Sequence, residues 1–338
     1  MPTQYQRTSV DIDVVYYGDV WDLEGAIARI QERFEADDTY FTFRPHVPEQ
    51  PTTTLPLRTY HVSVPTVCTD KELRGKSGQR LKVEFITTDK APLIHETRGE
   101  RLFALDTDRV YNVLPLDILF ADKLTTLGPR TIGIGNHRKD EQVKQIYDIH
   151  SLLVHNLESL DFNVVRNVYL ERAAEEARIR RIAFDMKAII RDAANQLGQL
   201  CMLDIDPTGN ILVWGDIANF LALYAGREAA RTQAQWANVG EQLKLVFRCL
   251  FDGNSADKTS LERAFALDKE LQFDHLSGAE KGLAIASFTA ALIRDFGGSS
   301  SIPPKLLKGK HIRRIYWSIV NADNLDKLEL FVLRNKAG

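Results

Sequence analysis

The sequence predicts an α+β fold, with a mixed-sheet core in residues 1–155 and a mainly helical domain in residues 156–338. Two observations lead to this prediction. The first part alternates β-branched and aromatic stretches with amphipathic ones, whereas the second shows mostly the three-to-four-residue apolar spacing of helices. The change near residues 155–162 is a shift in structural class without a linker composition. We therefore expect two domains that meet there.

Composition narrows the classes of protein to consider. The chain has 338 residues, 44% hydrophobic and 26% charged, which is enough for a substantial core. A net charge of −3 excludes a global field that draws in nucleic acid or membrane, so any nucleotide or RNA site must be a local patch. Three distant cysteines form no zinc spacing and indicate a reducing compartment. There is no apolar run of membrane-spanning length and no signal-peptide core, so we expect a cytoplasmic protein without a membrane partner.

In the first part, helical spacing predicts an amphipathic helix over about 20–35, and β-branched and aromatic residues predict strands over Thr39–Phe43 and Leu57–Val64. A proline-rich loop separates these strands. The elements expected next are a turn at 75–78, a strand at 81–86, short strands at 101–105 and 109–113, a helix from Pro115 to about Leu127, a loop at 133–136 and a helix at 139–155.

The second part carries helical patterns almost throughout. The expected helices cover 162–198 (as one long or two shorter helices), 216–225, 227–251, 258–272, 278–295 and 316–334. A turn cluster is expected at 204–210 and a single strand at 211–214.

Residues 9–14 alternate polar and apolar side chains with the period of a half-buried strand. Asp11 and Asp13 therefore point to the same face, roughly 7 Å apart along the strand. Two carboxylates this close repel each other unless a cation or a proton lies between them. Because Mg²⁺ binds one or two carboxylates together with substrate phosphates, the strand is a candidate metal platform for phosphoryl or nucleotidyl transfer. The alternative is an edge strand with two solvated aspartates.

Glu84 is a third candidate acid. It shares the more polar face of its strand with Lys82 and Ile86, opposite the apolar face. A neighbouring strand lies roughly 5 Å away, so Glu84 can join the aspartate pair. Three carboxylates around metal ions would activate a hydroxyl and neutralise a triphosphate. The alternative is a surface glutamate.

Lys123 lies on or beside the apolar stripe of the helix that begins at Pro115. A buried ammonium is costly unless it snorkels, pairs with a carboxylate or reaches an anionic ligand such as a phosphate. Asp148 lies near the buried side of the next helix, on a face that it shares with Lys144. An ordinary charged helix surface is the alternative for this ladder.

Two basic groups are candidates for contact with RNA. They are Arg172, Arg178, Arg180, Arg181, Lys187 and Arg191, and then Lys305, Lys308, Lys310, Arg313 and Arg314 beside Tyr316 and Trp317. Basic side chains can follow a phosphate backbone, and an aromatic ring beside them can stack on a base. Solvated helix faces are the alternative. The sequence contains no P-loop, GxGxxG or GxSxG motif.

Four segments occur in an informative order. They are Arg7-x-Ser9-x-Asp11-Ile12-Asp13, Leu81-Lys82-Val83-Glu84, Asp117–Leu124 and Lys144–Ile149. As an ordered set over about residues 5–155, they resemble the AbiEii/AbiGii (MenT-like) nucleotidyltransferase toxin family of the DNA polymerase β-like nucleotidyltransferase superfamily. The resemblance implies a nucleotidyltransferase-like mixed-sheet core followed by a helical domain.

The resemblance also implies a function, namely a metal-dependent nucleotidyltransferase that is the toxin of a type IV-like toxin–antitoxin system. Such a toxin would use Mg²⁺ or Mn²⁺ and would transfer a nucleotide from an NTP to an acceptor such as the tRNA 3′ end. A cognate antitoxin protein is the implied partner, with tRNA or another RNA as the acceptor. The implied catalytic residues are Asp11, Asp13, Glu84, Lys123 and Asp148, of which the first three are metal ligands. The implied nucleotide-binding residues are Arg7, Ser9, Lys123 and Lys144.

Two departures from the family pattern keep alternatives open. The family places a Gly-Gly-Ser/Thr or Gly-Ser element about ten residues before the aspartate pair, but no glycine precedes Asp11 here. Either the protein begins further upstream, or this member has lost part of its nucleotide site. The family also has a basic–acidic pair before the Tyr-Asp element, but this chain has Lys144-Gln145 there, so one acidic group is missing unless Asp140 substitutes for it. A catalytically impaired fold that binds a protein or RNA is therefore the second hypothesis, and an enzyme acting on a small molecule, as aminoglycoside nucleotidyltransferases do, is the third.

Overall fold

The structure is a computed structural model in which the chain divides into two compact units. The residues described are 11–36, 42–46, 57–63, 80–88, 91–98, 109–206, 212–226, 229–252, 257–273, 276–296, 312–320 and 324–336. Those up to Pro115 form the sheet unit, and those from Leu116 onward form the helical unit. The predicted domain boundary at 155–156 follows the change in structural class and stays a prediction.

The sheet unit contains the predicted mixed sheet. Its elements are β1 (Asp11–Tyr17), α1 (Val20–Ala36), β2 (Thr42–His46), β3 (Leu57–Ser63) and β4 (Arg80–Thr88). The strand order is β1-β4-β3-β2, with β1 parallel to β4 and the other pairs antiparallel. A separate antiparallel pair joins β5 (His95–Arg98) to β6 (Val110–Val113). The polar sequence of β5 lacks the apolar alternation that marks a strand, so it was not predicted, and the strand expected at 101–105 lies outside the described residues.

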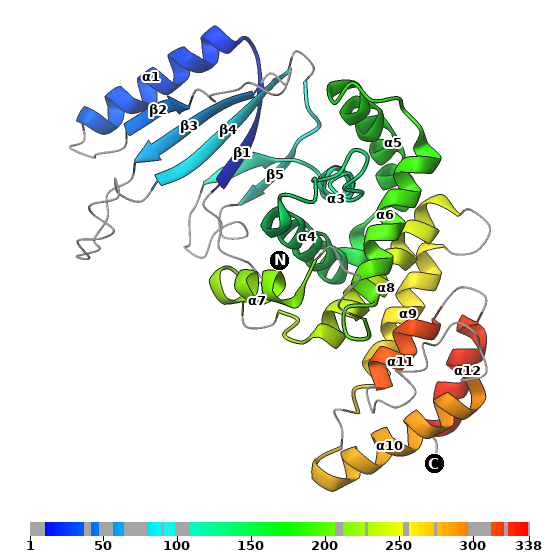
Figure 1. Cartoon of the computed structure of the whole chain (residues 1–338). Helices are drawn as coiled ribbons and strands as arrows, with labels where there is room; N and C mark the ends of the chain where they lie inside the picture. Colours follow the sequence, from blue (N-terminus) through cyan, green and yellow to red (C-terminus); the bar gives the residue numbers. More distant parts are fainter. Residues whose placement is uncertain are drawn as a thin grey trace. The chain divides into compact units, whose positions relative to one another are not determined.

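Helix α1 packs on one face of this sheet (Figure 1). Its apolar stripe places Leu23 and Ile27 against Tyr60 of β3, and all three are buried. Tyr16 and Phe85, from β1 and β4, pack around this cluster. Because side chains alternate along a strand, the residues between these core positions point to the opposite face. That opposite face carries the carboxylates.

The helical unit begins with α3 (Leu116–Leu124), α4 (Lys139–Asn156), the 3₁₀ turn Leu157–Ser159, α5 (Phe162–Ile179), α6 (Met186–Cys201) and α7 (Trp214–Leu223). It continues with α8 (Gln233–Phe251), α9 (Lys258–Glu270), α10 (Gly278–Phe296), α11 (Ile312–Ile319) and α12 (Leu325–Lys336). The mixed sheet followed by these helices confirms the predicted α+β class. No helix within the described ranges is long and apolar enough to cross a membrane.

Three local predictions need correction or refinement. The pattern over 162–198 is two helices, because the chain turns at Arg181, whose φ is 57°, before Asp185 caps α6. The helix predicted over 316–334 is also two, α11 and α12. The strand expected at 211–214 is wrong in its described part, because Trp214 already begins α7.

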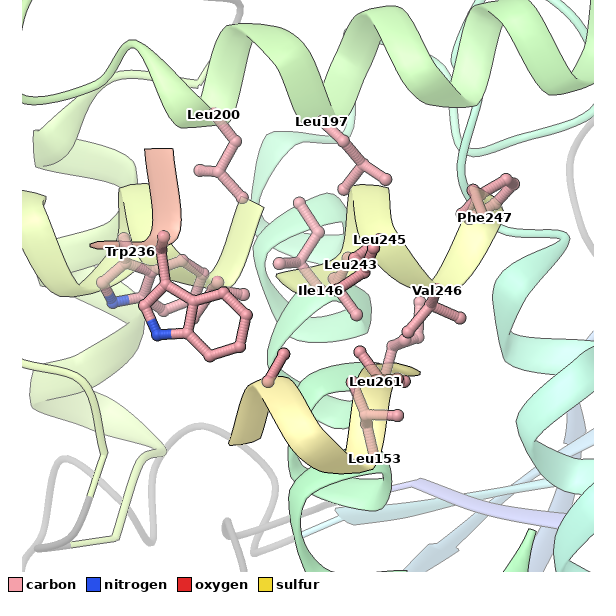
Figure 2. Close-up of a cluster of buried hydrophobic side chains, with 14 of the residues drawn as sticks. Ile146, Leu153, Leu197, Leu200, Trp236, Leu243, Leu245, Val246, Phe247 and Leu261 are labelled. Carbon is pink, nitrogen blue, oxygen red and sulfur yellow. The ribbon is translucent and has the colours of Figure 1, made fainter. Parts of the chain in front are cut away.

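A continuous apolar core holds the helical unit together. Figure 2 shows Leu197 and Leu200 of α6 directed toward the side chains of α8, with Ile146 of α4 beside them. Leu197, Leu243 and Ile146 are fully buried. Helical spacing of apolar residues places such side chains on one face of each helix, so the helices close around a shared interior.

The later basic group contributes to this interior. Arg314 is only 2% exposed, and its Nε lies 3.1 Å from an Asp204 carboxylate oxygen. Its Nη2 donates to the Cys201 carbonyl. Tyr316 and Trp317 are also buried. The interpretation of these three side chains as an RNA-binding surface is therefore wrong, and Lys305, Lys308 and Lys310 lie outside the described residues.

Candidate active site

The face of the main sheet opposite α1 carries rows of partly exposed polar side chains, whose positions follow from the strand register. The first row across the sheet is Asp11, Lys82, His61 and Arg44, and the second is Asp13, Glu84, Thr59 and His46. Directly opposed residues on paired strands project to the same side. The parallel pairing of β1 with β4 therefore brings Asp11, Asp13 and Glu84 onto one face, as the sequence predicts.

Lys82 is the positive centre of this group. Its Nζ lies 2.7 Å from Glu84 Oε2 and 3.9 Å from Asp11 Oδ1. Burial opposes its charge, but the hydrogen bond to Glu84 and the charges of Glu84, Asp11 and Asp13 outweigh that effect and raise the pKa of Lys82. The hydroxyl of Thr59 donates to the other Glu84 oxygen at 3.2 Å. Glu84 is therefore oriented by two neighbours and is not a freely solvated glutamate.

The donors on this face suit a divalent cation. Asp13 and Glu84 are register partners on adjacent strands, and Asp11 stands two residues before Asp13. The Lys82 ammonium lies between Asp11 and Glu84, so positive charge already offsets part of the charge of these two carboxylates. Among the described residues, no group of three or more His, Cys, Asp or Glu side chains is already gathered for metal binding. Mg²⁺ needs only one or two protein carboxylates when phosphates and water supply its remaining ligands.

Further basic groups follow on the strands beyond Lys82. His61 is its register partner on β3, and Arg44 is the partner of His61 on β2. The rings of His61 and His46 stack with centroids 4.8 Å apart. The first row thus runs from a carboxylate to three basic side chains, a charge order suited to a metal next to a polyphosphate. Local patterns in the sequence do not reveal this order, because it depends on pairing between strands that are distant in sequence.

Lys123 and Asp148 form a separate pair in the helical unit. Lys123 Nζ lies 3.0 Å from Asp148 Oδ2 and donates to Gln145 Oε1 at 3.1 Å. Both charged side chains are mostly buried, at 22% and 13% exposure. Of the three expectations for this lysine, the structure shows pairing with a carboxylate. The contact of Lys123 with a phosphate stays a prediction.

A tight turn between α3 and α4 helps to place this pair. Gly128 has φ 87°, a conformation that favours glycine. A Cβ on Gly133 would collide with the Leu127 carbonyl. The buried carboxylate of Asp192 accepts hydrogen bonds from Arg130 N at 2.7 Å and Thr131 Oγ1 at 3.0 Å. The turn is thus fixed to α6, and with it the end of α3 that carries Lys123.

The remaining predicted site residues, which are Lys144, Arg7 and Ser9, are not shown to join either group. Lys144 lies near Glu141 of its own helix, with Nζ 3.5 Å from the carboxylate. Arg7 and Ser9 lie outside the described residues. The structure therefore brings together Asp11, Asp13 and Glu84 in the sheet unit and, separately, Lys123 and Asp148 in the helical unit.

One comparison with known proteins identifies a relationship. The family model described as "Nucleotidyl transferase AbiEii toxin, Type IV TA system" matches residues 4–210, which is more than half of the chain. This span includes every predicted site residue. No curated protein matches the chain.

Proposed function

The chain belongs to the AbiEii nucleotidyl transferase toxin family of type IV toxin–antitoxin systems, and we propose that it transfers a nucleotide from an NTP to a hydroxyl group of an RNA acceptor, with the tRNA 3′ end as the acceptor to test first. The observation that carries this proposal is the placement of Asp11, Asp13 and Glu84 on one sheet face with Lys82 among them.

Mg²⁺ or Mn²⁺ is the cofactor in this proposal, and one or two of the carboxylates of Asp11, Asp13 and Glu84 would hold it at a time. The ion supplies Lewis-acid stabilisation of the phosphoryl oxygens. Most of the remaining catalysis is alignment and charge balance, which the sheet provides through fixed side chains. Arg44 and His61 would face the β- and γ-phosphates, where negative charge accumulates.

The reaction forms a bond between the acceptor oxygen and the α-phosphorus, while the bond from that phosphorus to the pyrophosphate oxygen breaks. The acceptor proton passes to a carboxylate or to water, and pyrophosphate carries the leaving electron pair. Glu84 either holds the metal or takes this proton. Lys123 is proposed to contact phosphate, and Asp148 holds it in position until the nucleotide binds. Arg7, Ser9 and Lys144 are proposed to border the nucleotide, and a protein antitoxin is the proposed partner.

Conservative removal of one carboxylate tests the proposal. Asp13→Asn should lower transfer of an α-labelled NTP to tRNA by about a thousandfold, because it removes charge where the transition state needs it. Asp22→Asn is the matched control, since Asp22 is an exposed acid on α1 in the same unit. Circular dichroism and thermal unfolding should be unchanged in both.

Transfer at the wild-type rate by Asp13→Asn, with any NTP and RNA acceptor that the wild-type protein uses, would contradict the proposal. The second hypothesis, a binding module, predicts a different result. The wild-type protein would then bind RNA or antitoxin without any transfer and without a metal-dependent affinity for triphosphate.

A further inference from the structure

The carboxylate face of the sheet continues into an apolar patch. Val15, Tyr17 and Ile86 project to this face and are 38%, 59% and 41% exposed. Val15 is the register partner of Ile86, which in turn pairs with Leu57 of β3. These residues form the rows that directly follow Asp13 and Glu84. We define Val15, Tyr17 and Ile86 as the apolar platform.

Single exposed apolar residues are ordinary, but a contiguous group of large ones marks a site for a ligand or partner. The platform does not serve the core of its own unit, because Leu23 and Ile27 of α1 pack on the opposite face of the same sheet. Val15 and Ile86 lie directly opposite each other on adjacent strands, so their exposed surfaces are continuous.

We propose that the apolar platform holds the nucleoside part of the nucleotide whose phosphates lie over the carboxylates, an inference that rests on the function proposed above. A nucleotide is charged at one end and has a flat, weakly polar ring at the other. The sheet face has the same division: charged rows at Asp11 and Asp13, then the platform. The step from Asp13 to Val15 is two residues, or roughly 7 Å along the strand, which leaves room for the sugar.

The chemistry of the platform fits a base. Branched aliphatic side chains present a flat surface on a pleated sheet, and Tyr17 adds an aromatic ring on which a base can stack. Stacking of this kind tolerates any base because every base has a π-face. The patch is therefore suited to recognise that a nucleoside is present and contributes little to the choice between bases.

The test compares two polar substitutions on one strand. Val15→Thr lies on the platform, and Ile12→Thr is the matched control because Ile12 is 49% exposed on the opposite face of β1. Threonine keeps the β-branched shape and strand propensity, so both variants are expected to fold. Ile86→Thr provides a second platform variant on β4.

Three probes separate the parts of the ligand: an ATP analogue with a methylene bridge between the α- and β-phosphates, inorganic tripolyphosphate, and Mn²⁺ alone. Platform variants should weaken binding of the ATP analogue by about tenfold, because the base would then bury a hydroxyl group in place of a methyl group. Tripolyphosphate and Mn²⁺ affinities should be unchanged, and Ile12→Thr should behave as wild type for all three probes.

The inference is overturned if the platform variants bind the analogue as wild type does, or if tripolyphosphate binding falls equally, which would indicate a disturbed fold. It is also overturned if these substitutions change only oligomeric state or antitoxin binding, since the patch would then be a protein interface. A further outcome separates the two proposals. If the wild-type protein binds tripolyphosphate and Mn²⁺ through Asp13 but binds the ATP analogue no more tightly than tripolyphosphate, this inference is overturned and the proposed function stays intact. Absence of all three affinities in wild type would overturn both.

Discussion

The two units of the chain use burial in different ways. In the sheet unit, α1 covers one face of a four-stranded sheet, and the other face carries charged groups that stay partly exposed. In the helical unit, the apolar side chains of successive helices form a continuous core, and buried charges such as Arg314 are paired inside it. One-sided packing therefore leaves rows of polar side chains outside the core of the sheet unit, whereas the helical unit encloses the paired charge of Arg314 within its core.

The two units should therefore respond differently to substitution. Substitutions on the exposed sheet face should change ligand binding or catalysis and leave stability nearly unchanged. Substitution of Arg314, whose charge is paired inside the helical core, should do the reverse.

The largest stability effect is expected for Arg314→Met. The change leaves the Asp204 carboxylate without its guanidinium and the Cys201 carbonyl without a donor. Removing one partner of a buried ion pair costs about 3–5 kcal/mol. Urea unfolding at neutral pH measures the loss. The double variant Arg314→Met/Asp204→Leu should recover part of it, because an apolar pair replaces the unpaired carboxylate. A loss below about 1 kcal/mol would show that the cluster is hydrated and not part of the core.

The next effect depends on pH. Burial lowers the pKa of His150 to about 4, although its 2.6 Å hydrogen bond with Gln242 opposes the shift, and the charges of His155 and Arg313 lower it further. The unfolded chain has an ordinary histidine pKa near 6.5, so it binds the proton first as pH falls. Stability should therefore decrease between pH 6.5 and pH 4, by about 3 kcal/mol in total.

His150→Gln isolates this contribution, since glutamine stays neutral and can still hydrogen-bond with Gln242. Urea midpoints of wild type and variant, measured at pH 7 and pH 4.5, should converge or cross as the pH is lowered. Parallel pH dependence of the two proteins would show that His150 does not titrate differently in the folded and unfolded states.

The sequence predicts those elements of the fold that depend on local patterns. Local periodicity was sufficient for α1, β1 and β4, because the alternation around Asp11 and Glu84 fixes which side chains share a face. The mixed-sheet core and the helical region followed from such patterns. The family also followed from the ordered motifs, and the match over residues 4–210 confirms it.

What sequence alone did not provide depends on contacts between distant segments. The position of Lys82 between Asp11 and Glu84 requires the parallel register of β1 with β4, which are separated by two other strands in the sequence. The basic neighbours of Arg314 in sequence predict a basic surface, yet its acidic partner Asp204 is 110 residues away. A run of like charges thus says little about exposure.

A smaller effect, on binding, is expected for Lys82→Met. The ammonium neutralises part of the charge of Asp11 and Glu84, so a divalent cation must compete with it for the same oxygens. Without it, Mn²⁺ alone should bind up to about tenfold more tightly, a difference of about 1.4 kcal/mol. Tripolyphosphate binding in the presence of Mn²⁺ should gain less, because the lysine also offers positive charge to the phosphates. Titration followed by electron paramagnetic resonance of free Mn²⁺ measures both. Weaker binding of Mn²⁺ alone would mean that Lys82 organises the carboxylates and does not compete with the ion.

The smallest effect is expected for the first basic group. Substitution there tests whether α5 of the helical unit carries an RNA-binding surface. Arg172 is 42% exposed, and its guanidinium lies 2.9 Å from Glu175 and 3.7 Å from Asp122. Exposed pairs contribute little, so Arg172→Ala should change the free energy of unfolding by less than about 0.5 kcal/mol. Its charge is already balanced by two carboxylates, so the salt dependence of tRNA binding should also be unchanged. A free phosphate contact would instead reduce the slope of log K against log salt by about one. That reduction would place an RNA contact on α5, where the pairing of Arg172 with Glu175 and Asp122 predicts none.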